Sequence, residues 1–246
     1  MRARPTLLSI LAAAALGVGV PAVAQAAPTV YAAASLNNAF PALDGAPKYN
    51  FAGSNTLQTQ IERGAPADVF ASASPTEAQA LFNKGLCSRP VTFATNILVL
   101  VVPKDNPAGV KSVYSLRGSG KRLAVGTAGV PIGNYTRLLL RRLHLTSVLS
   151  TNTVSQEKDV TSVLTKVALG SADAGFVYHT DALSTRGRTR EIRVPKWAQP
   201  AVRYQICAVK RPGANTAEAE AYIKKVVGGA GRTILKRYGF GLPPRG

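Results

Sequence analysis

Short apolar runs alternate with helical patterns along most of this chain, and this alternation constrains the fold more than any other feature. Near the N-terminus, three strand-like runs are each followed by a helical pattern, in the pairs 30–34 and from 36, 49–52 and 57–63, and 68–72 and 75–84. Successive βα units of this kind predict an α/β fold with mostly parallel sheets.

Two longer apolar runs, at 96–102 and 204–209, are typical of strands buried on both faces. Between them lie further strand and helix patterns, at 123–126, 132–143, 160–169 and 174–178. This order predicts an inserted second lobe, with the two long runs as crossover strands and a ligand cleft at the hinge between the lobes.

The predicted boundaries follow from these crossover strands. Lobe I comprises residues 27–94 and, after the chain returns, 205–246; lobe II comprises residues 95–204. The helical patterns after residue 216 belong to the returning part of lobe I.

The N-terminus has the pattern of a secretory signal. Arg2 and Arg4 precede an apolar run at 7–20, which leads to the small residues of Ala24-Gln25-Ala26. Removal of residues 1–26 leaves 220 of the 246 residues. We therefore expect export to the periplasm or another extracytoplasmic compartment, with an uncleaved membrane anchor as the alternative.

The formal net charge of +18 favours anionic partners without selecting one. The Lys and Arg residues are dispersed, which is typical of a solvated surface, and the export signal argues against nucleic acid as a partner. We expect a monomer.

Two cysteines, Cys87 and Cys207, follow the signal. In an oxidising compartment they could form one long-range disulfide; the alternative is two unrelated buried thiols. With His144 and His179 they form no recognisable metal-binding spacing.

Hydroxyl residues stand at two predicted turns from strand to helix. Ser35 follows the run at 30–34, and Ser54 follows Phe51-Ala52-Gly53. A serine at such a turn either caps the helix or contacts a ligand, and ligands of open α/β sheets bind at this edge. In lobe II, the helix starts at Ile132 and Val160 offer free backbone N–H groups to an anion, and Tyr178 adds a phenol at the end of a strand.

These residues lie in motifs that resemble the molybdate-binding proteins of bacterial ABC transporters, a family with the two-lobed periplasmic binding protein fold. The resemblance covers most of the chain after the signal. Its motifs are the segments 32–39, 51–57, 60–68, 122–126, 130–131, 159–160, 175–178 and 235–240.

The resemblance implies how a molybdate or tungstate ion is held. Ser35 and Ser54 would each give a hydroxyl and a backbone N–H, Ile132 and Val160 a backbone N–H, and Tyr178 its hydroxyl. The metal would be bound only as the oxyanion, with no direct protein ligand and no cofactor. Ile132 stands where the family often has alanine, and the segment after Leu36 is shorter than is usual there, which predicts a truncated first helix.

The predicted function is therefore capture of molybdate or tungstate and delivery to an ABC transporter permease. Two alternatives stay open. A binding protein of the same fold could take sulfate or another small anion, and an exported hydrolase could use Ser35 or Ser54 as nucleophile. The hydrolase lacks the G-x-S-x-G motif and has His144 and His179 as its only candidate bases.

Overall fold

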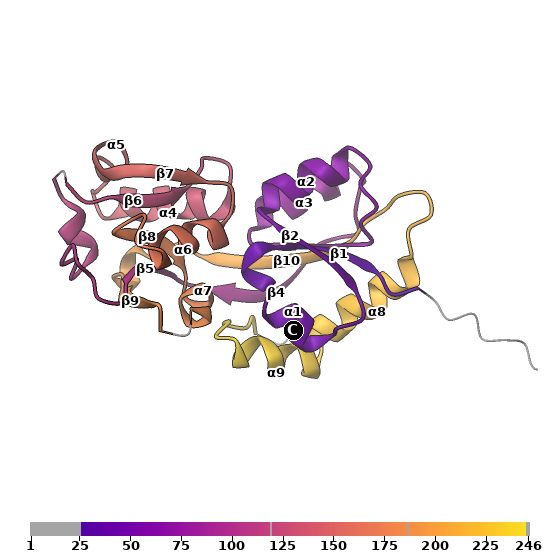
Figure 1. Cartoon of the computed structure of the whole chain (residues 1–246). Coiled ribbons are helices and arrows are strands. Elements are labelled where there is room, and N and C mark those ends of the chain that lie inside the picture. The colour runs from indigo at the N-terminus through magenta and orange to yellow at the C-terminus, as the bar shows by residue number, and fades with distance from the viewer. Residues whose placement is uncertain (1–25, 119, 186, 245–246) are drawn as a thin grey trace, which may run out of the picture.

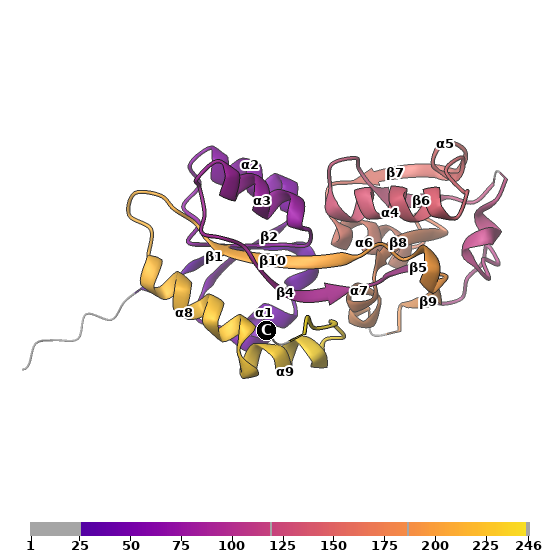
Figure 2. The same cartoon turned by 180° about the vertical axis from the view of Figure 1, so that it is seen from behind.

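The computed structural model describes residues 26–118, 120–185 and 187–244. The chain forms two five-stranded sheets that lie side by side (Figures 1 and 2). Except for Ala26, the predicted signal peptide lies outside the described residues. Within those residues, no helix combines the length and apolar character needed to cross a bilayer.

The first sheet has the strand order β2-β1-β3-β10-β4. Its strands are β1 (Thr29–Ala33), β2 (Lys48–Ala52), β3 (Val69–Ser72), β4 (Val91–Asn96) and β10 (Val202–Ala208). Helices α2 (Ser54–Glu62) and α3 (Pro75–Asn83) cover one face, and α1 (Ala39–Leu43), α8 (Thr216–Val227) and α9 (Gly229–Arg237) cover the other (Figure 1).

The second sheet has the order β7-β6-β8-β5-β9. Its strands are β5 (Leu98–Pro103), β6 (Leu123–Gly126), β7 (Thr153–Glu157), β8 (Ala174–Tyr178) and β9 (Thr189–Arg193). Its helices are α4 (Pro131–Arg142), α5 (Val148–Asn152), α6 (Val160–Ala168) and α7 (His179–Ser184). Three short 3-10 turns, η1 (Ala34–Leu36), η2 (Val113–Leu116) and η3 (Lys196–Ala198), complete the elements.

The prediction of mostly parallel sheets is wrong, because both sheets are mixed. Strands β1, β2 and β3 pair in parallel, as do β6, β7 and β8. The pairings of β10 with β3 and β4, and of β5 with β8 and β9, are antiparallel. The strands next to the two crossings, β4, β5, β9 and β10, are therefore antiparallel to their neighbours. A hydrophobic pattern indicates that a strand is buried but not in which direction it runs.

The apolar run at 96–102 is two strands and not one. Strand β4 ends at Asn96 in the first sheet, and β5 begins at Leu98 in the second. Between them Ile97 is 45% exposed, and its N–H donates to Asn96 Oδ1 over 2.9 Å. The Gln199 side chain, near the return crossing, bonds both the N–H and the C=O of Leu98. The predicted lobe boundaries fall inside β4 and β10, and the assignment of residues to the two lobes stays a prediction.

The predicted helix from residue 36 is replaced by the turn η1 and the short helix α1, so the expected truncation is confirmed. Pro41, Gly45 and Pro47 all lie in the segment that follows the turn, where proline and glycine disfavour a longer helix. Ser35 accordingly lies inside a 3-10 turn and does not cap an α-helix.

Two apolar clusters hold the elements together. The larger continues through both sheets, and the smaller lies beneath α2 and α3 and contains Cys87 and Cys207. Both cysteines are buried free thiols in this structure. Both belong to the same buried cluster, and hydrogen bonding with Cys207 lowers the pKa of the Cys87 thiol.

Candidate ligand site

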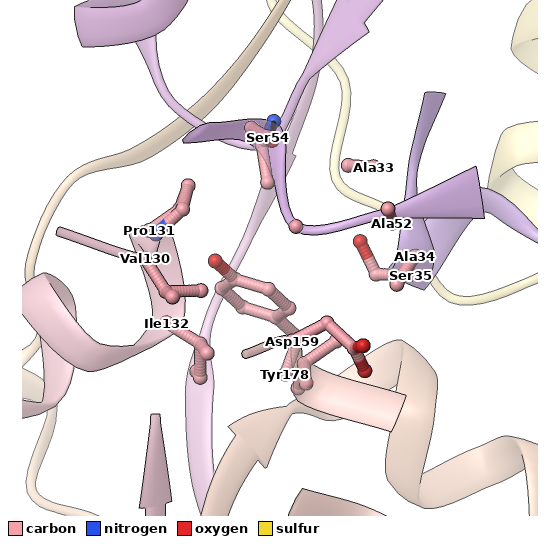
Figure 3. Close-up of a pocket in the computed structure, with 13 residues that line it drawn as sticks. Ala33, Ala34, Ser35, Ala52, Ser54, Val130, Pro131, Ile132, Asp159 and Tyr178 are labelled. Carbon is pink, nitrogen blue, oxygen red and sulfur yellow. Dashed lines mark hydrogen bonds between the residues drawn. The ribbon is translucent and has the colours of Figure 1, made fainter. Parts of the chain in front are cut away.

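A small hollow lies between the halves of the molecule built on the two sheets (Figure 3). It contains about 210 Å³ not occupied by protein atoms, a volume that includes space open to solvent. The five residues predicted to hold the ligand all line it: Ser35, Ser54, Ile132, Val160 and Tyr178. The fold therefore brings together residues from five separate elements.

Three helices begin at the hollow. Ser54 is the first residue of α2, Ile132 follows Pro131 at the start of α4, and Val160 is the first residue of α6. The first N–H groups of a helix have no intrahelical acceptor, and the helix dipole places partial positive charge there. The hollow is thus a place where backbone donors gather, as an anion requires.

Ser54 is one of the two serines that line the hollow. The side chain is 1% exposed, and its Oγ accepts a hydrogen bond of 3.0 Å from the Ala73 N–H. Gly53 is the N-cap of α2, so Ser54 does not cap its own helix. With one acceptor position of the oxygen filled by the backbone, the proton of Ser54 is free for a ligand.

Tyr178 offers a second hydroxyl from the opposite wall. It is 1% exposed, and its hydroxyl has no hydrogen-bond partner among the described residues. Figure 3 shows this hydroxyl directed into the space beside Val130 and Pro131. Burial raises the pKa of the phenol well above its ordinary value, so it stays a neutral donor. A buried hydroxyl without a partner is costly, which makes a ligand the natural acceptor.

Tyr178 is held in place by neighbouring rings. Tyr135 and Tyr204 meet it edge to face, with ring centroids 6.5 Å and 5.8 Å away. Ser35, on the first-sheet side, is bonded through its Oγ to the Tyr204 hydroxyl at 2.8 Å. Tyr204 belongs to β10, and sequence reasoning identified it only as the start of an apolar run.

Charged side chains contribute little to the hollow. Of its lining residues within the described chain, Asp159 alone is ionisable apart from Tyr178, and none is Lys or Arg. Asp159 caps α6 by accepting from the Ser162 N–H at 2.7 Å. Despite the net charge of +18, the lining has no basic side chain, and its hydrogen-bond donors are neutral hydroxyl and backbone N–H groups.

The serine hydroxyls bond partners other than histidine. Ser35 meets Tyr204, and Ser54 meets the backbone of Ala73. His179 Nδ1 lies 2.6 Å from Glu191 Oε2. Within the described part of the chain, neither serine is therefore hydrogen-bonded to a histidine base, and the hydrolase alternative finds no support in this geometry.

The comparisons with known proteins agree with this geometry. Residues 22–241 match the family model described as bacterial extracellular solute-binding protein. The chain belongs to this family of solute-binding proteins. The molybdate-binding protein ModA of Mycobacterium tuberculosis is 38% identical over 93% of this chain and 92% of its own length. ModA of Escherichia coli is 34% identical over 95% of this chain and 97% of its own length. The resemblance noted in the sequence is thus confirmed.

Solved structures confirm the two-lobed fold of this solute-binding protein. The periplasmic molybdate-binding protein of Azotobacter vinelandii matches with a TM-score of 0.77 and 24% identity, covering 88% of this chain and all of the other. The sulfate-binding protein SubI of Mycobacterium tuberculosis matches with 0.75 and 12% identity, covering 88% and 86%. At these identities the matches establish the fold alone.

A buried carboxyl lies directly behind Tyr178 in the solute-binding protein. Asp181, in the first turn of α7, accepts from the Tyr178 N–H at 3.1 Å. Burial raises the pKa of Asp181 to about 8. The group is therefore neutral near pH 7 and does not repel an anion in the hollow.

This raised pKa predicts how the free energy of unfolding depends on pH. Between about pH 4 and pH 8 the Asp181 carboxyl ionises in the unfolded chain but stays protonated in the fold, so its contribution to stability falls as pH rises through that window. Asp181→Asn should remove this part of the slope, measured by urea denaturation of the ligand-free protein at several pH values. Asp105→Asn, at an exposed position, is the control and should keep the wild-type slope. An unchanged slope in Asp181→Asn would contradict the prediction.

Proposed function

We propose that this protein captures molybdate or tungstate outside the cytoplasm and delivers it to an ABC transporter permease. The observation that carries the proposal is the convergence of Ser35, Ser54, Ile132, Val160 and Tyr178 on one small hollow lined by neutral donors. A doubly charged tetrahedral anion accepts hydrogen bonds in every direction, and each charge-assisted bond contributes about 1.5–3 kcal/mol.

The same donors favour an anion without protons. Phosphate carries at least one proton near neutral pH and so needs an acceptor in the site, whereas molybdate and tungstate need none. Asp159 is the one carboxylate among the lining residues; its Oδ1 accepts from the Ser162 N–H, so Oδ2 is the carboxylate oxygen that a protonated anion could meet. Sulfate carries no proton either, so its rejection must depend on its smaller size.

Sulfate is the second candidate, because it is also an unprotonated tetrahedral dianion that the same donors could bind. The curated relatives with 34–38% identity are molybdate-binding proteins, which is why molybdate is preferred here.

Calorimetric titration with molybdate, tungstate, sulfate and phosphate tests the proposal. We expect tight, saturable binding of molybdate and tungstate, with sulfate and phosphate far weaker. Saturation by sulfate alone would make sulfate, and not molybdate or tungstate, the ligand. Tight binding of phosphate would indicate that Asp159 accepts a hydrogen bond from the protonated anion. Failure of all four anions to bind would refute an oxyanion carrier.

We further propose that the chain is exported, cleaved after Ala26 and active as a non-enzymatic monomer. The family description and the N-terminal sequence pattern support export. N-terminal sequencing of the secreted protein should begin at Ala27; a start at Met1 would indicate a retained anchor.

In that compartment we propose that Cys87 and Cys207 form a disulfide. Each thiol loses one hydrogen to a disulfide oxidant such as glutathione disulfide, which becomes two thiols. Intact mass should fall by two hydrogens, and the unfolded, unreduced protein should resist alkylation. Two alkylated cysteines in the exported protein would contradict the pairing. The double variant with Ser at both positions is the control.

A further inference from the structure

We infer that Tyr204 and Asn96 fix the direction of the Ser35 hydroxyl, so that Ser35 accepts from Tyr204 and has its own proton to donate to the ligand. The inference rests on the proposed function and adds two positioning residues to it. Tyr204 is fully buried, and among the described residues the groups within hydrogen-bond distance of its hydroxyl are Ser35 Oγ at 2.8 Å and Asn96 Nδ2 at 3.5 Å. The direction of the proton follows from these two neighbours.

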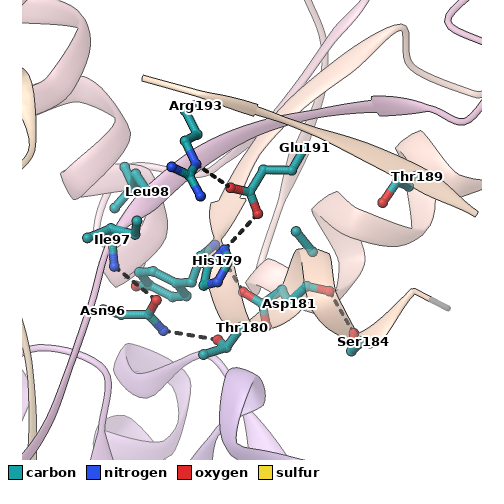
Figure 4. A network of polar contacts seen from close by, with 12 residues as sticks. Asn96, Ile97, Leu98, His179, Thr180, Asp181, Ser184, Thr189, Glu191 and Arg193 are labelled. Atoms are coloured by element: carbon teal, nitrogen blue, oxygen red, sulfur yellow. Dashed lines mark hydrogen bonds and ion pairs between the residues drawn. The ribbon is translucent and has the colours of Figure 1, made fainter. Parts of the chain in front are cut away.

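The Asn96 amide has a defined orientation. Its Oδ1 accepts from the Ile97 N–H at 2.9 Å, and its Nδ2 donates to Thr180 Oγ1 at 3.0 Å, as Figure 4 shows. Because a backbone N–H can only donate, the oxygen of the amide must face Ile97. The NH₂ group therefore faces Tyr204 and offers no lone pair to its proton.

Ser35 is then the acceptor for Tyr204. If Ser35 donated instead, the phenol proton of Tyr204 would be buried without an acceptor, which is strongly disfavoured. With Tyr204 donating to its Oγ, Ser35 has its own proton free for the hollow. Burial raises the pKa of Tyr204 well above its ordinary value, so this donor persists across neutral pH.

The hydroxyl groups of Ser54 and Ser35 are thus arranged in the same way. Ser54 Oγ accepts from the Ala73 N–H, and Ser35 Oγ accepts from the Tyr204 hydroxyl. In each case the protein fills an acceptor position of the oxygen and leaves the proton for the ligand. Asn96 is the last residue of β4, just before the chain crosses from the first sheet to the second. The direction of the Ser35 hydroxyl is therefore set at this first crossing.

A double-mutant cycle tests the inference. Tyr204→Phe should weaken molybdate binding by up to about tenfold, the loss of one neutral hydrogen bond. In a Ser35→Ala background the same change should have no further effect on affinity, because Tyr204 acts through Ser35. Tyr222→Phe, which removes a buried hydroxyl bonded to Tyr49, is the control and should leave affinity unchanged.

The ratio of the phosphate and molybdate dissociation constants is a second measurement. In Tyr204→Phe the Ser35 oxygen is free to accept from a protonated oxyanion, so this ratio should fall relative to the wild type. Equal weakening by Tyr204→Phe with and without Ser35, together with an unchanged ratio, would overturn the inference. Failure of the wild type to bind molybdate would refute the proposed function instead.

Discussion

The Gly53→Ala variant should bind molybdate at least about a hundredfold more weakly than the wild type while keeping its fold. Gly53 has φ −60° and ψ 136°, which alanine adopts without strain. A methyl group there would lie 2.3 Å from the carbonyl oxygen of Lys158, just before α6. This contact joins the two halves of the molecule at the rim of the hollow, so the methyl group must push them apart.

The expected loss follows from the geometry of the donors. Separation would move Ser54 away from Val160, so that one ion could no longer reach both walls. Calorimetry should record the loss of affinity, and thermal unfolding of the ligand-free protein should change little. Gly45→Ala, where an added methyl group meets nothing within 4 Å, is the matched control. Wild-type affinity in Gly53→Ala would show that the hollow binds ligand without this close approach.

Tyr178→Phe should have opposite effects on binding and on stability. The variant loses a donor to the anion, so affinity should fall by about tenfold to a hundredfold, the equivalent of one charge-assisted hydrogen bond. The ligand-free protein should be as stable as the wild type or more stable, because the removed hydroxyl is buried without a partner.

Denaturant unfolding without ligand and calorimetry with molybdate measure the two effects. Tyr222→Phe provides the reverse pattern, because its hydroxyl is bonded to Tyr49 and lies away from the hollow. We expect that control to lose stability and keep affinity. A loss of stability in Tyr178→Phe would mean that its hydroxyl has a partner in the free protein, and unchanged affinity would remove Tyr178 from the binding set.

Much of the fold could be predicted from local patterns. The starts of α2, α4 and α6 lie within three residues of the predicted positions, since apolar periodicity, Pro131 and Asp159 indicate them locally. Strands β7 and β9 were missed because their residues are half-exposed and carry no continuous apolar run. The turn after β1 was misread because a short 3-10 turn has no periodicity of its own.

The candidate site could be predicted only in part. The five lining residues were identified by their places at helix starts and strand ends, together with the family resemblance. The groups that orient them were not. Tyr204 lies 169 positions from Ser35, and Ala73 lies 19 from Ser54, so no local pattern connects these pairs.

The sequence by itself determined the order of the elements and the places where donors stand, because capping, turns and hydrophobic periodicity depend on neighbours along the chain. The tertiary structure alone decided the mixed pairing of the sheets, the approach of Gly53 to Lys158 and the direction of the serine hydroxyls. These depend on groups that meet only after the crossovers have placed the two sheets side by side, and their energies come from packing and hydrogen bonds between distant segments.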